Sequence, residues 1–199
     1  ANGSYSRADD SYTLYVATSA TQAINPLIYR KLPFDTQKDF APITILGDVP
    51  NVLIVNKDMP VKTVADFVAL AKSKPGQLHY GSSGNGTSMH LAAEQFKMVA
   101  GVDLLHIPYR SSGTAVTDLM GGQIQAMFHQ VRAVIGMIQG KSLKAVAVTT
   151  RDRVAALPDV PTVAETYPGF ESMTWYRLFA PPGTPAPVVR RVNRGGTGA

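Results

Sequence analysis

The chain has no cysteine among its 199 residues, which excludes disulfide bonds and thiolate metal sites. It also lacks an apolar run near the roughly 18 residues that a membrane-spanning helix needs. The first residues do not show the basic and then apolar pattern of a signal peptide, so in an exported protein we expect that segment to have been removed. The absence of cysteine fits the cytoplasm and the periplasm equally well.

Charged residues are also scarce, at 17% of the chain, and the formal net charge is +5. The basic side chains are scattered, apart from Arg190, Arg191 and Arg194 in a glycine-rich tail. Nucleic-acid binding normally uses a concentrated basic face with interleaved aromatic residues. The composition therefore predicts a protein without a nucleic-acid partner, whose 45% of hydrophobic residues can form one large core or two small ones.

The central part of the chain alternates between helix and strand patterns. Thr63 and Asp66 form a capping box for a helix that Lys74-Pro75-Gly76 ends. Ser112 is a candidate cap and Gly121 a candidate stop for a later helix. The expected strands are Leu78–Tyr80, Leu104–Ile107, Ile124–Phe128 and Leu143–Thr149, with further helices near Met89–Phe96, Thr114–Met120 and Ala133–Gln139. This alternation predicts an α/β fold with a parallel sheet and right-handed crossovers.

The flanks of this central block have a different pattern. The expected elements are strands at Tyr12–Ala17 and Thr174–Phe179, a short helix near Ala23–Tyr29, and two extended runs within Ile43–Asn56. We interpret the flanks as paired crossings between two lobes. Residues 1–55 then form part of lobe 1 and the first crossing, residues 56–172 form lobe 2, and residues 173–199 form the return crossing and a remnant of lobe 1. One strand and a short helix cannot cover an apolar strand on both faces, so we expect lobe 1 to be incomplete.

Residues 81–90, Gly-Ser-Ser-Gly-Asn-Gly-Thr-Ser-Met-His, are the most informative segment for function. They join a strand to a helix at the carboxyl edge of the predicted sheet, where open α/β sheets bind ligands. Glycines let a ligand approach the backbone, and the amides, hydroxyls and dipole of a helix start favour an anion. A flexible turn with an ordinary cap is the alternative, and the segment lacks the lysine of a Walker loop. The candidate ligand-binding residues here are Ser83, Gly84, Asn85, Gly86, Thr87 and Ser88.

Two other places add candidates. The segment after the first strand offers the hydroxyls of Ser19 and Thr21 at a helix start, so the two loops together suggest a cleft between lobes; a plain helix cap is the alternative. His129 ends a strand, and its side chain either faces the ligand or packs away from it. The histidines lie too far apart along the chain for a metal site, so we expect neither a metal nor a cofactor. A triad of Ser83, His129 and Asp118 can be assembled on paper, but triads are recognised by geometry and not by sequence order.

Several short segments, in order from about Asp10 to Val192, resemble a known family. They are Ile24–Pro26, Pro50–Leu53, Tyr80–Ser88 with His90–Ala92, His106–Tyr109, Asp118–Gln123, Ala147–Thr150, Leu157–Thr162 and Ala180–Pro185. With them the chain resembles the Bug/TctC family, the extracytoplasmic solute-binding receptors of tripartite tricarboxylate transporters. The resemblance implies a two-lobed periplasmic-binding-protein type II fold that closes on a small carboxylate by hinge motion, without catalysis. It also implies a periplasmic location and membrane transporter subunits as partners.

By position, the resemblance makes Gly84–Ser88 the carboxylate-holding loop of lobe 2 and Thr18–Thr21 a contributing loop of lobe 1. His129 and Gln130 stand where the family often has Asp-Asn, and Arg132 stands where proline is common. These departures put the usual contacts there in doubt and make the local charge more positive. We therefore expect a pocket that favours a ligand with a second carboxylate over an amino acid.

The resemblance also indicates missing parts. Family members begin with a strand and a Pro-Gly-Gly loop, and they continue well past the segment that matches Gly183–Pro185. We therefore expect a receptor truncated at both ends, with a complete lobe 2, that binds weakly or not at all. It should expose apolar surface that favours self-association. Two alternatives to a receptor stay open, namely an α/β enzyme such as a hydrolase or transferase, and a non-binding fragment with an open sheet edge.

Overall fold

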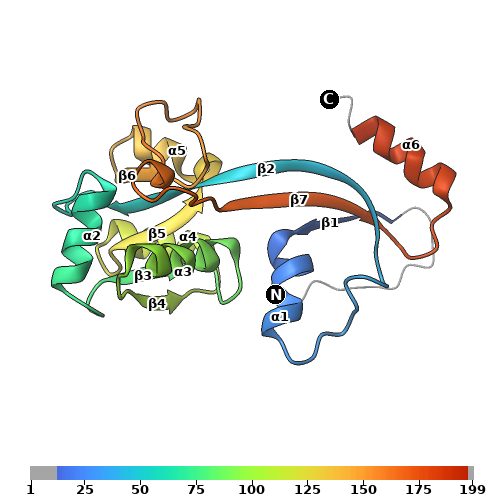
Figure 1. Ribbon diagram of the computed structural model, residues 1–199, viewed down its shortest axis with the longest axis horizontal. Helices are drawn as coiled ribbons and strands as arrows, with labels where there is room; N and C mark the ends of the chain where they lie inside the picture. Colours follow the sequence, from blue (N-terminus) through green and yellow to red (C-terminus); the bar gives the residue numbers. More distant parts are fainter. Residues whose placement is uncertain (1–12, 197–199) are drawn as a thin grey trace. The chain divides into compact units, whose positions relative to one another are not determined.

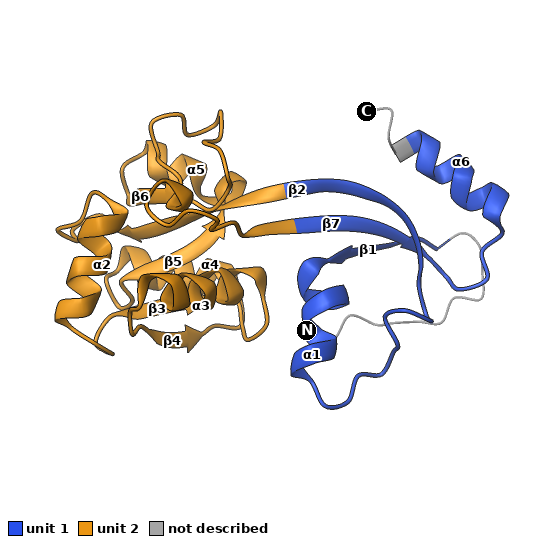
Figure 2. Cartoon of the chain, viewed as in Figure 1, with its two compact units in different colours: residues 1–48, 175–199 blue, residues 49–174 orange. Residues whose placement is uncertain are grey.

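The computed structural model describes residues 13–196, and the chain divides into two units. Unit 1 comprises residues 1–48 and 175–199, and unit 2 comprises residues 49–174 (Figure 2). Two strands, β2 (Ala41–Asn56) and β7 (Met173–Ala180), pass from one unit to the other. The two extended runs expected around Pro50 form the single strand β2.

Unit 2 contains a sheet in the order β6-β2-β5-β3-β4 (Figure 1). Besides β2, its strands are β3 (His79–Ser82), β4 (Leu105–Pro108), β5 (Ala126–Gln130) and β6 (Leu143–Val148). β3 is parallel to both β4 and β5, as the alternation of strands and helices predicts. β2, which the sequence analysis assigned to the first crossing, lies between β5 and β6 and is antiparallel to both, so the strands of the central block share one direction but the sheet as a whole is mixed. Parallel neighbours need a crossover connection, but a helix between two strands does not require them to be parallel: β2 and β3 are joined through α2 (Val64–Ser73) and run in opposite directions.

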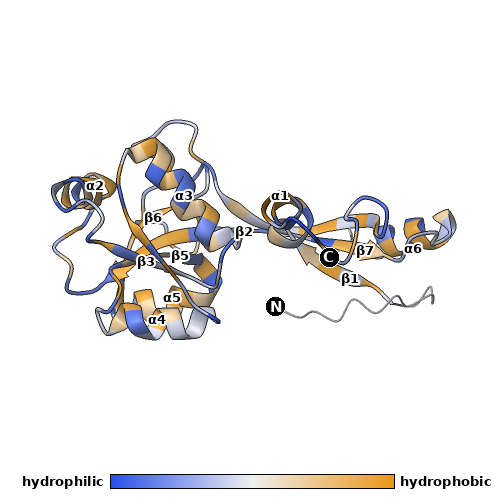
Figure 3. Cartoon of the chain, turned by 90° about the horizontal axis from the view of Figure 1, so that it is seen from below, coloured by the Kyte–Doolittle hydropathy of each residue, from blue (hydrophilic) through white to orange (hydrophobic). Residues whose placement is uncertain are grey.

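Helices cover both faces of this sheet, with α3 on one side and α4 and α5 on the other (Figure 3). The helices of unit 2 are α2 (Val64–Ser73), α3 (Ser88–Ala100), α4 (Ser112–Met120), α5 (Val131–Gln139) and the short 3₁₀ helix η2 (Val163–Glu165). Leu53 and Val55 of β2 enter the core under α2 and α3, whereas Val52 and Ile54 enter the core under α4 and α5. β2 is therefore apolar at successive positions because both of its faces are covered.

Local side chains determine where these helices begin. Asp66 N–H donates to Thr63 Oγ at 3.1 Å, and Thr63 N–H donates to the Asp66 carboxylate at 3.0 Å, which confirms the capping box. The cap of α4 is Ser111, whose Oγ accepts from Thr114 N–H at 3.3 Å, so the expected cap Ser112 is instead the first helical residue. Two adjacent serines satisfy the same pattern, and only the backbone geometry distinguishes them.

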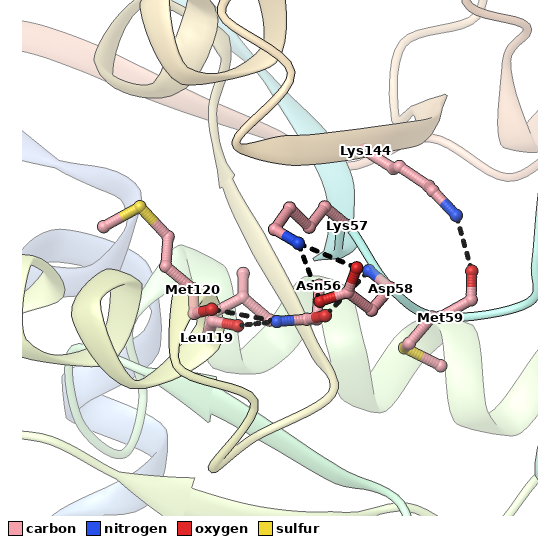
Figure 4. Close-up of polar contacts among 7 residues, drawn as sticks. All are labelled: Asn56, Lys57, Asp58, Met59, Leu119, Met120 and Lys144. Atoms are coloured by element: carbon pink, nitrogen blue, oxygen red, sulfur yellow. Dashed lines mark hydrogen bonds and ion pairs between the residues drawn. The ribbon is translucent and has the colours of Figure 1, made fainter.

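A buried asparagine attaches the end of β2 to the end of α4 (Figure 4). The Nδ2 of Asn56 donates to the carbonyl oxygens of Leu119 at 2.8 Å and Met120 at 3.0 Å. Its Oδ1 accepts from Asp58 N–H at 2.9 Å. Carbonyls in the last turn of a helix lack the regular partner four residues further on. Asn56 therefore caps α4 from a neighbouring strand.

Unit 1 has less regular structure. β1 (Tyr15–Thr18) pairs antiparallel with β7, from Tyr15 opposite Phe179 to Thr18 opposite Tyr176. The start of the expected strand, Tyr12, lies outside the described residues. The remaining elements are the π-helix η1 (Ala20–Ile24), α1 (Asn25–Ile28) and α6 (Ala186–Gly196). The ring centroid of Phe40 lies 5.2 Å from that of Tyr15 and 6.1 Å from that of Phe179, so the three rings form a small aromatic cluster.

Two features of unit 1 bear on the sequence-based expectations. Arg190, Arg191 and Arg194, which the sequence analysis placed in a glycine-rich tail, lie on the helix α6. Pro187 falls in the first turn of that helix, where proline is tolerated. Unit 1 also exposes several large apolar side chains, namely Leu14, Val16, Leu27, Ile28, Tyr29, Ile45 and Leu46. Within residues 13–196, no helix is long and apolar enough to span a membrane.

Candidate ligand-binding site

The segment between β3 and α3 is a tight loop stabilised by its own hydrogen bonds. Gly84 has φ +121° and Gly86 has φ +76°, conformations that side-chain-bearing residues rarely adopt. Ser82, at the end of β3, accepts the N–H of Gly84 on its Oγ at 3.1 Å. Thr87 Oγ donates to the carbonyl oxygen of Gly84 at 2.8 Å. The glycines therefore allow a turn that leads directly from the strand into the helix.

The start of α3 leaves backbone donors available. Thr87 is the N-cap, and its Oγ accepts from His90 N–H at 3.4 Å. For the N–H groups of Ser88 and Met89, the described part of the chain shows no hydrogen-bond partner. Such first-turn donors and the helix dipole together favour a negatively charged oxygen. The geometry of this turn is therefore suited to binding a carboxylate.

The structure brings the predicted residues 83–88 together in this loop and helix start. Their side chains have different roles. Ser83 Oγ donates to the sulfur of Met89 at 3.5 Å, Asn85 is exposed, and Gly86 is buried. The Thr87 hydroxyl is already engaged as a cap, so its contribution to a ligand site is to position the turn.

His129 lies at the same edge of the sheet, because β5 runs parallel to β3 with Gly81 opposite Met127. The ring is buried, and this desolvation lowers the pKa of His129, although the carbonyl of Gln130 acts in the opposite direction. The imidazole is therefore neutral near pH 7. Of the departures from the family pattern, Arg132 at the start of α5 brings a positive charge to this edge.

The unit 1 candidates surround the start of η1. Thr21 Oγ donates to Thr18 O at 3.0 Å and accepts Thr18 N–H at 3.1 Å, which is a local turn. Ser19 Oγ is buried, and among the described residues it has no hydrogen-bond partner. The Nε2 of Gln22, a residue that the sequence analysis did not select, is also buried and has no hydrogen-bond partner among the described residues. Buried polar atoms without partners require an explanation, and a bound ligand is one. Whether these groups share a cleft with the loop of unit 2 stays a prediction.

Sequence reasoning missed the side chains that support the loop of unit 2. His90 Nδ1 accepts the N–H of Gly86 at 3.3 Å, and His106 Nε2 lies 2.7 Å from Ser82 Oγ. His90 is the third residue of α3, the position from which a capping-box side chain reaches back to the backbone, and this position was the available signal. His106 carried no comparable signal, because its contact depends on the pairing of β3 with β4.

The structure gives no support to catalytic or metal chemistry in the described range. Asp118 accepts from the hydroxyl of Tyr109 at 2.8 Å, and no hydrogen bond joins Ser83 or Asp118 to His129 among the described residues. No cluster of three or more potential metal ligands occurs within residues 13–196.

An open groove of about 590 Å³ lies near the amino end of β6, away from the loop. Lysines line it, but Lys57 pairs with Asp58 at 2.8 Å and Lys144 donates to Met59 O at 2.5 Å. Lys57 and Lys144 therefore already have partners within the chain. The turn before α3, with its unpaired donors, is therefore the better candidate.

Comparison with known proteins places this geometry in a family. Residues 3–199 match the family described as tripartite tricarboxylate transporter family receptor. A protein of Pseudomonas sp. strain P51, the UPF0065 protein in the tcbD-tcbE intergenic region, is 38% identical over 92% of this chain and 55% of its own length. BugT of Bordetella pertussis is 34% identical over 94% of this chain and 58% of its own length. The chain thus spans little more than half the length of these curated relatives.

Solved structures agree with this assignment. A protein of R. palustris solved with adipate superposes with a TM-score of 0.88 and 35% identity, over 94% of this chain and 63% of that one. MatC from Rhodopseudomonas palustris, with bound malate, superposes with a TM-score of 0.83 and 29% identity, over 94% of this chain and 64% of that one. The periplasmic binding protein BugD superposes with a TM-score of 0.85 and 31% identity, over 96% of this chain and 64% of that one. The α/β fold matches these type II periplasmic binding proteins over part of their length, and the chain belongs to the tripartite tricarboxylate transporter receptor family, a family of solute-binding receptors and not of enzymes.

Proposed function

We propose that this chain is the central part of an extracytoplasmic receptor that captures a small organic acid with two or more carboxylates. One observation carries the proposal: the N–H groups of Ser88 and Met89 have no partner in the described chain, at the first turn of a helix of 13 residues. Two donors side by side, together with the helix dipole, suit the two oxygens of one carboxylate.

Two further observations support a second carboxylate on the ligand. Arg132 follows β5 at the same edge of the sheet, and a guanidinium binds carboxylates through parallel hydrogen bonds. The relatives solved with adipate and with malate hold dicarboxylic acids. We therefore expect tighter binding of such acids than of amino acids, whose ammonium group would lie near a cation.

The wider role follows from the family. Relatives described as periplasmic support a periplasmic location, with membrane transporter subunits as the partners of the loaded receptor. We retain residues 56–172 as a complete lobe 2, with residues 1–55 and 173–199 as the crossings and an incomplete lobe 1. The exposed apolar side chains of unit 1 support weak ligand binding and self-association by the isolated chain.

Titration calorimetry on a proline variant tests this function. Ser88 is the first residue of α3, where proline fits the helix but removes the N–H, and the extended backbone of Thr87 accepts a following proline. We expect Ser88→Pro to weaken adipate or malate binding by about tenfold or more, the effect of one hydrogen bond to a charged group. Ser112→Pro makes the same change at the first residue of α4 and should leave the affinity unchanged.

The outcomes separate the alternatives. Equal affinities for Ser88→Pro and Ser112→Pro would place the carboxylate elsewhere. Tighter binding of an amino acid with a single carboxylate, such as alanine or leucine, than of adipate and malate would contradict the preference for a second carboxylate. No measurable binding of any acid by the unmodified chain, in a state that light scattering shows to be monomeric and circular dichroism shows to be folded, would contradict ligand capture by this portion alone and favour the alternative of a non-binding fragment.

A further inference from the structure

A cluster of titratable side chains lies directly behind the loop that precedes α3. The His106 ring of β4 stacks on Tyr80 of β3, with centroids 4.8 Å apart and an interplanar angle of 18°. The ring of His90 lies 4.3 Å from that of His106, centroid to centroid. Tyr80 is fully buried, and its hydroxyl donates to Glu94 of α3 at 2.5 Å. The two histidines therefore meet in a partly buried layer between the sheet and α3.

Each histidine reaches one of the two glycines with positive φ. His90 accepts the N–H of Gly86 on Nδ1 at 3.3 Å. His106 acts through Ser82, whose Oγ lies 2.7 Å from His106 Nε2 and accepts the N–H of Gly84 at 3.1 Å. Both positive-φ glycines of the loop are thus contacted by an imidazole, Gly86 directly and Gly84 through Ser82, whose Oγ also bonds the carbonyl of Gly84 at 3.1 Å.

The contact with Gly86 determines the protonation state that the loop needs. A backbone N–H is only a donor, so His90 Nδ1 must carry no proton to accept from it. Protonation of His90 removes this hydrogen bond, and protonation of both rings places two positive charges in contact.

The other charged groups facing these rings in the described chain are Glu94 and Lys97 of α3. The Glu94 carboxylate already accepts from Tyr80 and from Lys97, the latter at 2.9 Å. Desolvation lowers the pKa of His90, and desolvation together with the neighbouring His90 lowers the pKa of His106 to about 4. Both rings are therefore neutral at pH 7, and they take up protons in acid.

We propose that His90 and His106 are positioning residues that hold the Gly84–Thr87 loop in its carboxylate-binding conformation, and that His90 does so only while its ring is neutral, so that acidification weakens ligand binding. The ligand part of this inference rests on the proposed function, whereas the loop part does not. A negative ligand near the rings would act in the opposite sense by favouring their protonation, and the experiment decides between the two effects.

The first arm of the test needs no ligand. Amide resonances of Gly84 and Gly86 in the whole chain are followed by NMR between pH 7.5 and pH 4.5. In the unmodified chain we expect the Gly86 amide to shift with the imidazole resonances of His90, and the Gly84 amide to shift less, because the pKa of His106 is lowered to about 4. In His90→Asn the side-chain oxygen replaces Nδ1 as acceptor without titrating, so the Gly86 shift should be lost. A Gly86 amide that does not follow His90, or that shifts equally in His90→Asn, would overturn the inference.

The second arm measures dicarboxylate affinity, with adipate as the probe, at the same two pH values. Protonation of adipate itself affects all variants alike, so the ratio of dissociation constants is compared between them. We expect the affinity of the unmodified chain to fall about tenfold more than that of His90→Asn, which corresponds to one hydrogen bond. His106→Gln, which retains a polar atom near Nε2 and leaves His90 in place, should keep most of the fall, because His106 itself is mostly neutral at pH 4.5.

His79→Asn, in β3 but outside the cluster, is the matched control and should keep the unmodified profile. Equal pH profiles for the unmodified chain and His90→Asn, or affinity that rises in acid, would overturn the inference while leaving the receptor function intact. If adipate does not bind at either pH, ligand capture by this portion alone fails, and the glycine amides still decide the role of the histidines.

Discussion

Replacing Thr87 by valine removes one hydroxyl from the candidate site and keeps the shape of the side chain. That hydroxyl accepts from His90 N–H at 3.4 Å and donates to Gly84 O at 2.8 Å. Loss of an N-cap costs about 1 kcal/mol, and a second hydrogen bond adds about 0.5–1 kcal/mol. Because the capping bond is long, we expect about 1.5 kcal/mol less stability in urea denaturation. The same change releases the turn that orients Ser88 and Met89, so calorimetry should show adipate affinity about tenfold lower.

Thr63→Val is the matched control for this prediction. Thr63 is also an N-cap, accepting from Asp66 N–H at 3.1 Å, but it begins α2 and not α3. We expect a stability loss of about 1 kcal/mol and no change in affinity. The reasoning would be refuted if Thr87→Val kept full affinity despite its lower stability. It would also be refuted if both variants lost affinity to the same extent, because the effect would then come from general destabilisation.

Three further predictions concern the scaffold. Asn56→Ala removes three hydrogen bonds and should lower the free energy of unfolding in urea by about 2–4 kcal/mol; a loss below about 1 kcal/mol would show that water replaces them. Gly81→Ala places a Cβ 2.5 Å from Ile124 Cδ1 and should cost about 1–3 kcal/mol by overpacking, measured in the same way. The Arg153 guanidinium lowers the pKa of Glu165 to about 2. The stabilising effect of this ion pair is therefore present at pH values above the ordinary glutamate pKa of 4.5 and is lost as the pH falls toward 2. NMR titration should show this pKa return toward 4.5 in Arg153→Gln, and an unchanged pKa would contradict the pairing.

Much of the local structure of unit 2 could be predicted from its sequence. The capping box at Thr63 and Asp66, the glycine stop at Gly121, and the position of the glycine-rich loop all depend on residues within a few positions of one another. Interactions of this kind form in the same way whatever the rest of the chain does. The family could also be recognised from the sequence, because the segments that resemble it follow one another in order along the chain.

Other features depended on contacts that no local pattern encodes. The direction of β2, the burial of His129 and the unsatisfied Ser19 hydroxyl arise from which strands pair and which surfaces become covered. The amphipathic pattern of α6 was hidden by the glycines that follow Arg194. The limits of lobe 2 and the site assignments stay predictions.

The sequence by itself determined the alternation of helices and strands in unit 2 and the tight glycine turn before α3, because propensity, capping and glycine conformations act over a few residues. Only the tertiary structure placed His90 and His106 behind that turn. They are 16 positions apart in the chain, and the pairing of β3 with β4 and the packing of α3 bring their rings together. Hydrogen bonds and desolvation depend on distance in space, so the groups that contact the loop could be identified only from the fold.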